Sequence, residues 1–91
     1  MHLKWSEFAL DEYDAQLFYL ALENEGLAVK TQGLLEAALS HLLVFPGIGQ
    51  AGRCPGTFEF SVKKAPLLIV YEVQADVLTV LRILHTSRNY P

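Results

Sequence analysis

The stretch TFEFSVKKAPLLIVYEVQADVLTVLRILH, residues 57–85, decides the fold, because it contains three strand patterns in quick succession. The first pattern, residues 57–63, alternates apolar and polar side chains, which predicts a strand with one face toward a core. The second, residues 67–73, is apolar on both faces, as in a central strand that is covered on both sides. The third occupies residues 77–85. The short connections favour antiparallel neighbours, so we expect a meander.

Two helices are predicted before this meander. Ser6 offers an N-cap, and the apolar residues of 7–23 recur at steps of three and four, which is typical of an amphipathic helix. The segment 24–26 contains Asn and Gly and interrupts the pattern, and a second periodic run then continues to Leu42. The segment 3–5 is extended in character. The predicted order is β-α-α-β-β-β, an α+β fold with a helical hairpin packed on one face of a mainly antiparallel sheet.

FPGIGQAGRCPG, residues 45–56, contains four glycines and two prolines, so we expect a loop here rather than a helix or strand. It lacks the GK[ST] ending of a phosphate-binding loop, and it precedes a strand rather than a helix. A helix-to-strand connection is therefore the favoured interpretation. Cys54 is the only cysteine of the sequence, which excludes an internal disulfide and a multi-cysteine metal site.

Size and composition predict one domain, residues 1–91, that is rich in apolar side chains. Hydrophobic residues form 52% of the chain and charged residues 19%, so some apolar surface is expected to be left for a partner. Residues 1–52 carry two lysines against seven carboxylates, whereas residues 53–91 carry five cations against three carboxylates. This basic excess is too small to indicate direct DNA binding. The chain has neither a membrane-spanning apolar run nor a signal-peptide pattern, which predicts a cytoplasmic protein.

The order of elements and three stretches of the chain resemble the RelE/ParE toxin superfamily of bacterial type II toxin–antitoxin modules, and the ParE branch most. These stretches are FPGIGQAGRCPGT (45–57), VKKAPLLIVYEV (62–73) and VLRILHTSRNYP (80–91). The resemblance covers nearly the whole chain. It implies a small toxin domain, held inactive in a hetero-oligomer by a cognate antitoxin whose C-terminal segment wraps along the hairpin and the sheet. In the ParE branch the described target is DNA gyrase, whereas RelE toxins cleave mRNA on the ribosome.

The two branches require different side chains. Cleavage of RNA needs a base, an acid and a cation around one phosphate. The RelE branch has cations about where Glu59, Ser61 and Leu68 stand here, and none of these three can supply positive charge. The resemblance therefore implies a gyrase inhibitor that acts by protein–protein contact, with no catalytic residues, metal or cofactor. Two alternatives stay open: a ribosome-dependent mRNA endonuclease built from His85, Arg88, Tyr90, Lys63 and Lys64, and a non-toxic relative that only binds antitoxin.

The chain also departs from the ParE pattern at three positions. Phe58 replaces the usual arginine, Leu67 replaces an aromatic residue, and Glu72 replaces a basic one. The changes at Phe58 and Glu72 remove positive charge from the surface that is expected to bind the target, and Leu67 removes an aromatic ring. The toxin could accordingly be fully active, weakened or directed at a different target.

Two sets of candidate binding residues follow from this resemblance and from the side chains themselves. The target-binding candidates are Arg53, Lys63, Arg82, His85, Arg88 and Tyr90. The antitoxin-binding candidates are Leu17, Leu20, Leu35, Leu39, Leu68 and Val70. Both sets are expected on surfaces that another macromolecule can reach.

Several of these side chains also have structural interpretations. Regular alternation places Arg82 on the strand face of Leu78 and Val80, where its charge would reach solvent or pair with Glu72 or Glu59. His85 is interpreted as a residue that holds the end of the strand, with general-base chemistry as the alternative. A tail that is docked through Tyr90 and exposes Arg88 is expected. Core or hairpin packing is expected for four aromatic residues, Trp5, Tyr13, Phe18 and Tyr19.

Overall fold

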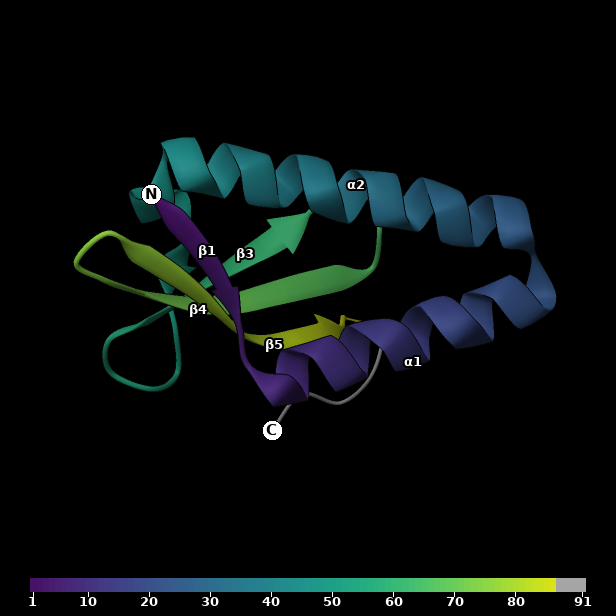
Figure 1. The fold of residues 1–91 in the computed structure, drawn as a ribbon, viewed down its shortest axis with the longest axis horizontal. Coiled ribbons are helices and arrows are strands. Elements are labelled where there is room, and N and C mark those ends of the chain that lie inside the picture. Colours follow the sequence, from purple (N-terminus) through teal and green to yellow (C-terminus); the bar gives the residue numbers. More distant parts are fainter. Residues whose placement is uncertain (87–91) are drawn as a thin grey trace.

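The computed structural model describes residues 1–86. Its elements are β1 (His2–Trp5), α1 (Glu7–Glu23), α2 (Glu25–Val44), the 3₁₀ turn η1 (Pro46–Ile48), β2 (Gln50–Ala51), β3 (Thr57–Val62), β4 (Leu67–Gln74) and β5 (Val77–His85). The strands form one sheet in the order β1-β5-β4-β3-β2, in which only β1 and β5 are parallel. The two helices form an antiparallel hairpin beside this sheet (Figure 1). The predicted α+β class and the three-stranded antiparallel meander are confirmed.

The helix ends lie where the sequence predicts them. The Ser6 hydroxyl accepts a hydrogen bond from the Ala9 N–H at 3.0 Å and so caps α1. Asn24 serves both helices, because its backbone N–H donates to the Leu20 carbonyl at 2.7 Å while its side chain accepts from the Leu27 N–H at 3.1 Å. One residue therefore ends α1, begins α2 and makes the hairpin turn tight.

The core lies between the helices and one face of the sheet. Its fully buried large side chains are Leu35, Leu42, Ile69, Tyr71, Leu78, Val80 and Ile83. On β3 the expected alternation is confirmed, since Val62 is buried and Phe58 and Phe60 pack against the same core. The sheet and α2 thus share one apolar interior.

The third meander strand departs from regular alternation. Tyr71 pairs with Val80 and Val70 pairs with Arg82, so Leu81 is an extra residue and forms a β-bulge. As a result Val80 and Ile83 both face the core and are fully buried. The prediction that Arg82 shares a face with Val80 was wrong, because the bulge reverses the alternation beyond Leu81.

The glycine-rich segment also differs from the prediction. Residues 45–56 were expected to be a loop, but they contain η1 and the short strand β2, which pairs antiparallel with β3. The Tyr71 hydroxyl holds this segment by donating to the Pro46 carbonyl at 2.7 Å and accepting from the Gly49 N–H at 3.1 Å. A long-range contact of this kind leaves no periodic pattern in the sequence.

Helix α1 covers the part of β5 that β1 does not reach. β1 ends at Trp5, which pairs with Val80. Beyond that point α1 supplies the hydrogen bonds: the Ser6 hydroxyl donates to the Leu81 carbonyl at 2.8 Å, and the Gln16 amide donates to the Ile83 carbonyl at 2.9 Å. A strand edge left unpaired is costly and prone to aggregation, so these polar side chains take the place of a neighbouring strand.

Candidate functional site

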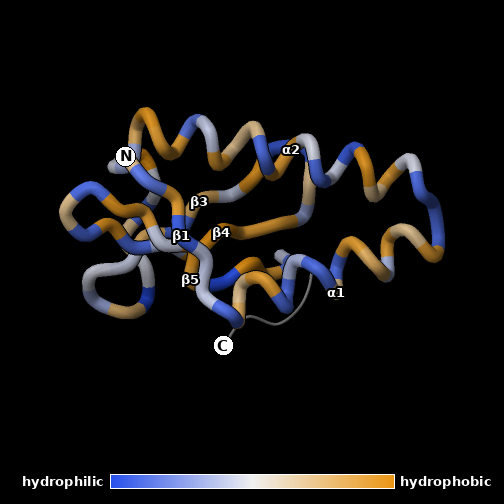
Figure 2. Tube along the Cα trace, in the orientation of Figure 1, coloured by the Kyte–Doolittle hydropathy of each residue, from blue (hydrophilic) through white to orange (hydrophobic). Residues whose placement is uncertain are grey.

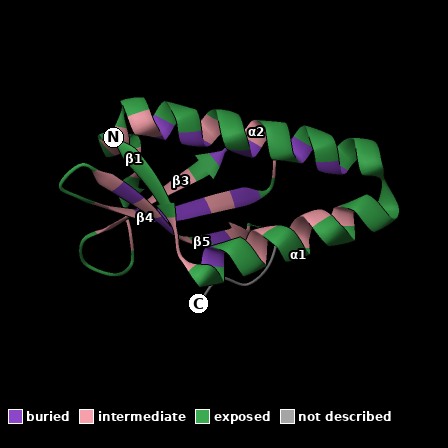
Figure 3. Cartoon of the chain, in the orientation of Figure 1, coloured by how far each residue is buried: buried purple, intermediate pink, exposed green. Residues whose placement is uncertain are grey.

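The helical hairpin extends past the end of the sheet (Figure 1). Five large apolar residues on this overhang are between 43% and 70% exposed, and we call them the hairpin tip: Phe18, Tyr19, Leu22, Leu27 and Val29. Figure 2 shows apolar segments on both helices of the overhang, and Figure 3 shows many exposed residues there. The hairpin tip is therefore a candidate interaction site.

The tip corrects one prediction about the aromatic residues. Trp5 and Tyr13 stack on each other with ring centroids 5.5 Å apart and pack against the core, as expected. Phe18 and Tyr19 were predicted to pack in the core or hairpin, but both are mostly exposed and contact each other edge to face at 5.9 Å. The prediction failed because both residues lie on the overhang, where Tyr19 borders an open pocket rather than the packed core.

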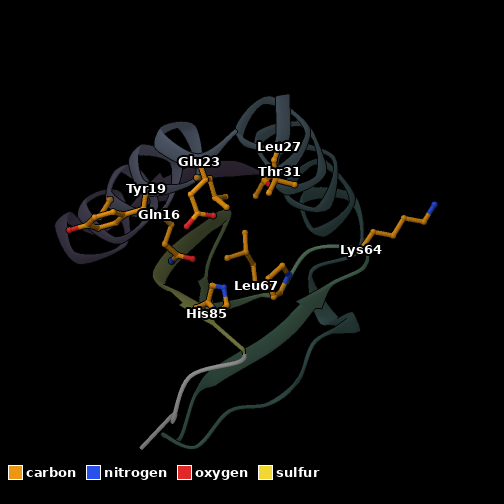
Figure 4. Close-up of a pocket in the computed structure, with 11 residues that line it drawn as sticks. Gln16, Tyr19, Glu23, Leu27, Thr31, Lys64, Leu67 and His85 are labelled. Atoms are coloured by element: carbon orange, nitrogen blue, oxygen red, sulfur yellow. The ribbon is translucent and has the colours of Figure 1, made fainter. Parts of the chain in front are cut away.

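A pocket of about 330 Å³ lies where the overhang meets the sheet (Figure 4). Its helical wall includes Gln16, Leu20, Glu23 and Leu27, and its floor includes Leu67 at the start of β4. His85, Pro66 and Lys64 complete the sheet side. The lining is therefore mainly apolar, with a few polar groups at defined places.

Two polar groups of this pocket are hydrogen-bond acceptors, Gln16 Oε1 and the Glu23 carboxylate, and Thr31, Lys64 and His85 line it as well. The Gln16 amide nitrogen donates a hydrogen bond to the Ile83 carbonyl, whereas the amide oxygen Oε1 is buried and has no hydrogen-bond partner within residues 1–86. In Figure 4 the Glu23 carboxylate points into the pocket and the Lys64 side chain points away from it. The pocket can therefore accept hydrogen bonds and one positive charge.

A second hollow, also of about 330 Å³, lies beside β3. Ile48 and Gln50 form one side of it, and Glu59, Ser61 and Leu68 come from β3 and β4. The Glu59 carboxylate accepts a hydrogen bond from the Arg53 backbone N–H at 3.3 Å. In the described part of the chain, residues 1–86, no lysine or arginine lines this hollow.

Tyr71 fixes one wall of the hollow. Its ring is fully buried and stacks on Phe58 at 5.4 Å, while its hydroxyl ties η1 and Gly49 to the sheet. Burial raises the pKa of Tyr71 above its usual value, and the hydrogen bond from Gly49 partly opposes that rise. The hydroxyl therefore stays protonated and keeps donating to the Pro46 carbonyl.

The four target-binding candidates within residues 1–86 lie at three separate places, one of which is that of Arg82, described below. Lys63 and His85 are at the end of the sheet nearest the hairpin tip, since β3 ends at Val62 and His85 pairs with Leu67. Arg53 is near the opposite end of β3, a strand about 20 Å long at roughly 3.3 Å per residue. Arg88 and Tyr90 lie outside the described residues.

Arg82 is held by a helix residue. Its guanidinium makes a two-pronged ion pair with the Glu12 carboxylate, with the Nη2 to Oε2 distance at 2.8 Å, and Glu12 Oε1 also accepts from the Ile83 N–H. The predicted partners of Arg82 were the strand carboxylates of Glu72 and Glu59. The pairing with Glu12 depends on α1 lying along β5, which no local pattern indicates.

The antitoxin-binding candidates also differ in exposure. Leu35 and Leu39 belong to this chain's own core, at 0% and 5% exposed, and Val70 is 7% exposed. Leu17, Leu20 and Leu68 are partly exposed. The residues that sequence reasoning missed are those of the hairpin tip. No local pattern indicates their exposure, because it depends on where α1 starts: β1 ends opposite Val80, midway along β5, so α1 begins there and runs past the end of the sheet.

The two helices, residues 7–44, are acidic. They carry seven carboxylates and a single lysine, Lys30. Neither helix in the part of the chain that is described is long and apolar enough to cross a membrane. Within residues 1–86 there is also no group of three or more His, Cys, Asp or Glu side chains that could hold a metal ion.

Comparison with known proteins gives a consistent result. The model of the family described as "ParE toxin of type II toxin-antitoxin system, parDE" matches residues 3–90. A structure of the chromosomal ParDE toxin–antitoxin system from P. aeruginosa is similar, with a TM-score of 0.80 and 24% identity, over 93% of this chain and 95% of that one. The intact E. coli RelBE toxin–antitoxin complex contains a chain that is similar with a TM-score of 0.63 and 22% identity, over 90% of this chain and 92% of that one. No curated protein sequence matches significantly.

Proposed function

The chain belongs to the ParE toxin family of type II toxin–antitoxin systems, and we propose on that basis that it inhibits DNA gyrase by protein–protein contact. A cognate antitoxin neutralises it by covering the hairpin tip and the neighbouring sheet. No residue of this chain performs covalent chemistry in this proposal.

The observation that carries the proposal is the lining of the hollow beside β3. Phosphoryl transfer in RNA builds negative charge that a cation must stabilise. Glu59, Ser61 and Leu68 offer a carboxylate, a hydroxyl and an alkyl group there. A carboxylate a few ångströms from a phosphate repels it by about 1 kcal/mol in water and more in a less polar site. This supports a toxin that binds a protein over one that cleaves RNA.

The position of His85 supports the same choice. A general base has to reach the proton that it removes, at about 3 Å or through one water. His85 lines the pocket beneath the hairpin, whereas Glu59 and Ser61 line the hollow beside β3. The endonuclease alternative would therefore have to assemble its groups at the hairpin end of the sheet, from His85, Lys63 and Lys64, with Arg88 and Tyr90 from the tail.

We place the gyrase-binding surface at the basic end of the sheet. Lys63, Lys64 and His85 lie there, and Arg88 follows His85 by three positions. Arg53 and Arg82 contribute less in this proposal, because Arg53 lies near the other end of β3 and Arg82 is paired with Glu12. Positive charge steers association with an acidic surface of the target.

The antitoxin-binding surface is proposed at the hairpin tip. The chains similar in structure come from toxin–antitoxin systems. The tip supplies the exposed apolar area that a helix or extended segment of a partner can bury. Leu17 and Leu20 would lie at the border of the contact, and Leu35 and Leu39 support it from the core, whereas Leu68 lines the hollow beside β3.

Two assays test the proposed function. Purified chain added to gyrase should inhibit DNA supercoiling, and ribosome-bound mRNA should remain intact in its presence. Cleavage of the mRNA without any effect on gyrase would overturn the proposal in favour of the endonuclease alternative. Expression without antitoxin should arrest growth, and a harmless chain would instead indicate a relative that only binds antitoxin.

A further inference from the structure

We propose that the pocket beneath the hairpin tip receives a lysine or arginine side chain from the antitoxin. The inference rests on the proposed function in one respect, namely that the hairpin is the antitoxin-binding surface. It adds the chemistry of the anchor residue and of the segment that carries it.

The shape and apolar walls of the pocket fit the stem of such a side chain. Leu20 and Leu27 from the helices face Leu67 and Pro66 from the sheet across a space of about 330 Å³. Lysine and arginine bury three or four methylene groups along apolar surface and keep a charged end for polar partners. A shorter polar side chain would leave these walls in contact with water.

The polar groups of the pocket fit the charged end. Gln16 is oriented by the hydrogen bond that its Nε2 donates to the Ile83 carbonyl, which leaves Oε1 as a buried acceptor with no partner within residues 1–86. Glu23 directs its carboxylate into the same space (Figure 4). A cationic donor pairs with the Glu23 carboxylate, whereas a carboxylate in its place would be repelled.

Two other groups at the pocket can carry positive charge. Lys64 is exposed and points away from the pocket, and His85 lies on its sheet side (Figure 4). Neither donates a hydrogen bond to Gln16 Oε1. The ammonium or guanidinium of a partner therefore enters from the hairpin side, next to Glu23.

The charge of the whole hairpin favours a basic partner segment. The two helices carry seven carboxylates and a single lysine. Within residues 1–86, Glu12 is the only helix carboxylate that forms an ion pair with a cation of the sheet. This negative field attracts a cationic segment and raises its rate of association. It also disfavours a second copy of this chain as the occupant, because two acidic hairpins would then meet at their tips.

The test uses peptides selected against the purified full chain. Random linear peptides are displayed on phage, and the tightest binder is synthesised together with a version in which its basic residue is replaced by norleucine. We expect the selected peptides to share a lysine or arginine, and the norleucine version to bind roughly tenfold more weakly or worse.

Two variants connect the effect to the pocket. Glu23→Gln should weaken the basic peptide by roughly the same factor and leave the norleucine version unchanged, which is the signature of a direct pairing. Glu25→Gln removes a neighbouring exposed carboxylate and should leave both affinities within about twofold. Circular dichroism of each variant verifies that the fold is retained.

Three results would overturn the inference. The first is that none of the selected peptides contains a basic residue. The second is that Glu23→Gln leaves the affinity for the basic peptide unchanged. The third is that the chain associates with itself and buries the hairpin tip. The gyrase assay is independent of all three. A chain that leaves gyrase active but shows the Glu23 dependence would refute the proposed target and keep the pocket assignment.

Discussion

At the scale of single residues, Tyr71 connects the core to the glycine-rich segment. Its ring is part of the core and stacks on Phe58, while its hydroxyl bonds to Pro46 and Gly49 in the glycine-rich segment. Buried polar atoms need such partners, because an unpaired donor or acceptor costs more than a hydrogen bond gains. One side chain therefore determines where η1 lies relative to β3.

Tyr71→Phe is expected to lower the free energy of unfolding by about 1–2 kcal/mol, because the Pro46 carbonyl and the Gly49 N–H both lose their partner. Urea denaturation followed by circular dichroism measures this. Tyr19→Phe is the matched control, since the Tyr19 side chain is exposed, and it should change stability by less than about 0.5 kcal/mol. Equal effects of the two substitutions would contradict the role assigned to Tyr71.

Gly49→Ala is expected to destabilise the chain or displace η1. A Cβ at position 49 would stand 2.5 Å from the Tyr71 hydroxyl oxygen and 3.0 Å from two of its ring carbons. Such overpacking costs typically about 1–3 kcal/mol. Gly47→Ala is the control, because a Cβ there meets nothing within 4 Å. Thermal melts of the two variants should differ clearly, and identical melts would mean that the segment yields without cost.

Alkaline pH should destabilise the fold through its buried phenols. Burial raises the pKa of Tyr71, and burial together with Glu36 and Asp14 raises the pKa of Tyr13. Above the ordinary tyrosine pKa of about 10, the unfolded chain releases protons that the folded chain retains, so stability falls as pH rises. Denaturation midpoints measured between about pH 8 and 11, a range that brackets the ordinary tyrosine pKa, test this. Tyr71→Phe should show a shallower decline, and an unchanged slope would exclude Tyr71 as a cause.

At the scale of elements, α1 acts as the neighbour that the end of β5 lacks. Ser6, Glu12 and Gln16 supply hydrogen bonds to Leu81 and Ile83 from successive turns of the helix. Glu12 also neutralises Arg82 on the same strand. The helix therefore closes a sheet edge and removes one cation from the surface at once.

Glu12→Ala should cost about 1–2 kcal/mol of stability, because it leaves the Ile83 N–H and the Arg82 guanidinium without this carboxylate. Asp11→Ala, at an exposed position on the same helix, should be close to neutral. Chemical denaturation of both variants gives the comparison. A cost that persists in full when Arg82 is also replaced by Met would assign the effect to the Ile83 contact alone.

At the scale of the whole molecule, an acidic and apolar hairpin projects from a small sheet. The overhang leaves Phe18, Tyr19 and Leu22 exposed, and the pocket with Glu23 lies directly below. The hairpin contributes to the apolar core at other positions, through Leu35 and other residues of α2. Surface and core leucines of the same hairpin should therefore respond differently to substitution.

Leu22→Ser is expected to leave the melting temperature nearly unchanged and to reduce binding of the dye ANS, which reports exposed apolar surface. Leu35→Ala is the contrasting change, because Leu35 is fully buried, and it should cost about 2–5 kcal/mol. Thermal melts and dye fluorescence measure both. A large loss of stability from Leu22→Ser would show that the tip is part of the folded core rather than a docking surface.

The sequence by itself determined the order of elements, their caps and the faces of β3 and β4. These depend on neighbours within a few positions, such as Ser6 with Ala9, and on the two- and four-residue periods of strands and helices. The resemblance of its glycine-rich and C-terminal stretches also led to the correct family. Only the tertiary structure decided the bulge at Leu81, the Glu12–Arg82 pair and the pocket beneath the tip. Glu12 and Arg82 are 70 positions apart, and the pocket exists because α1 begins midway along β5 and runs past its end, so both depend on how complete elements are placed in space.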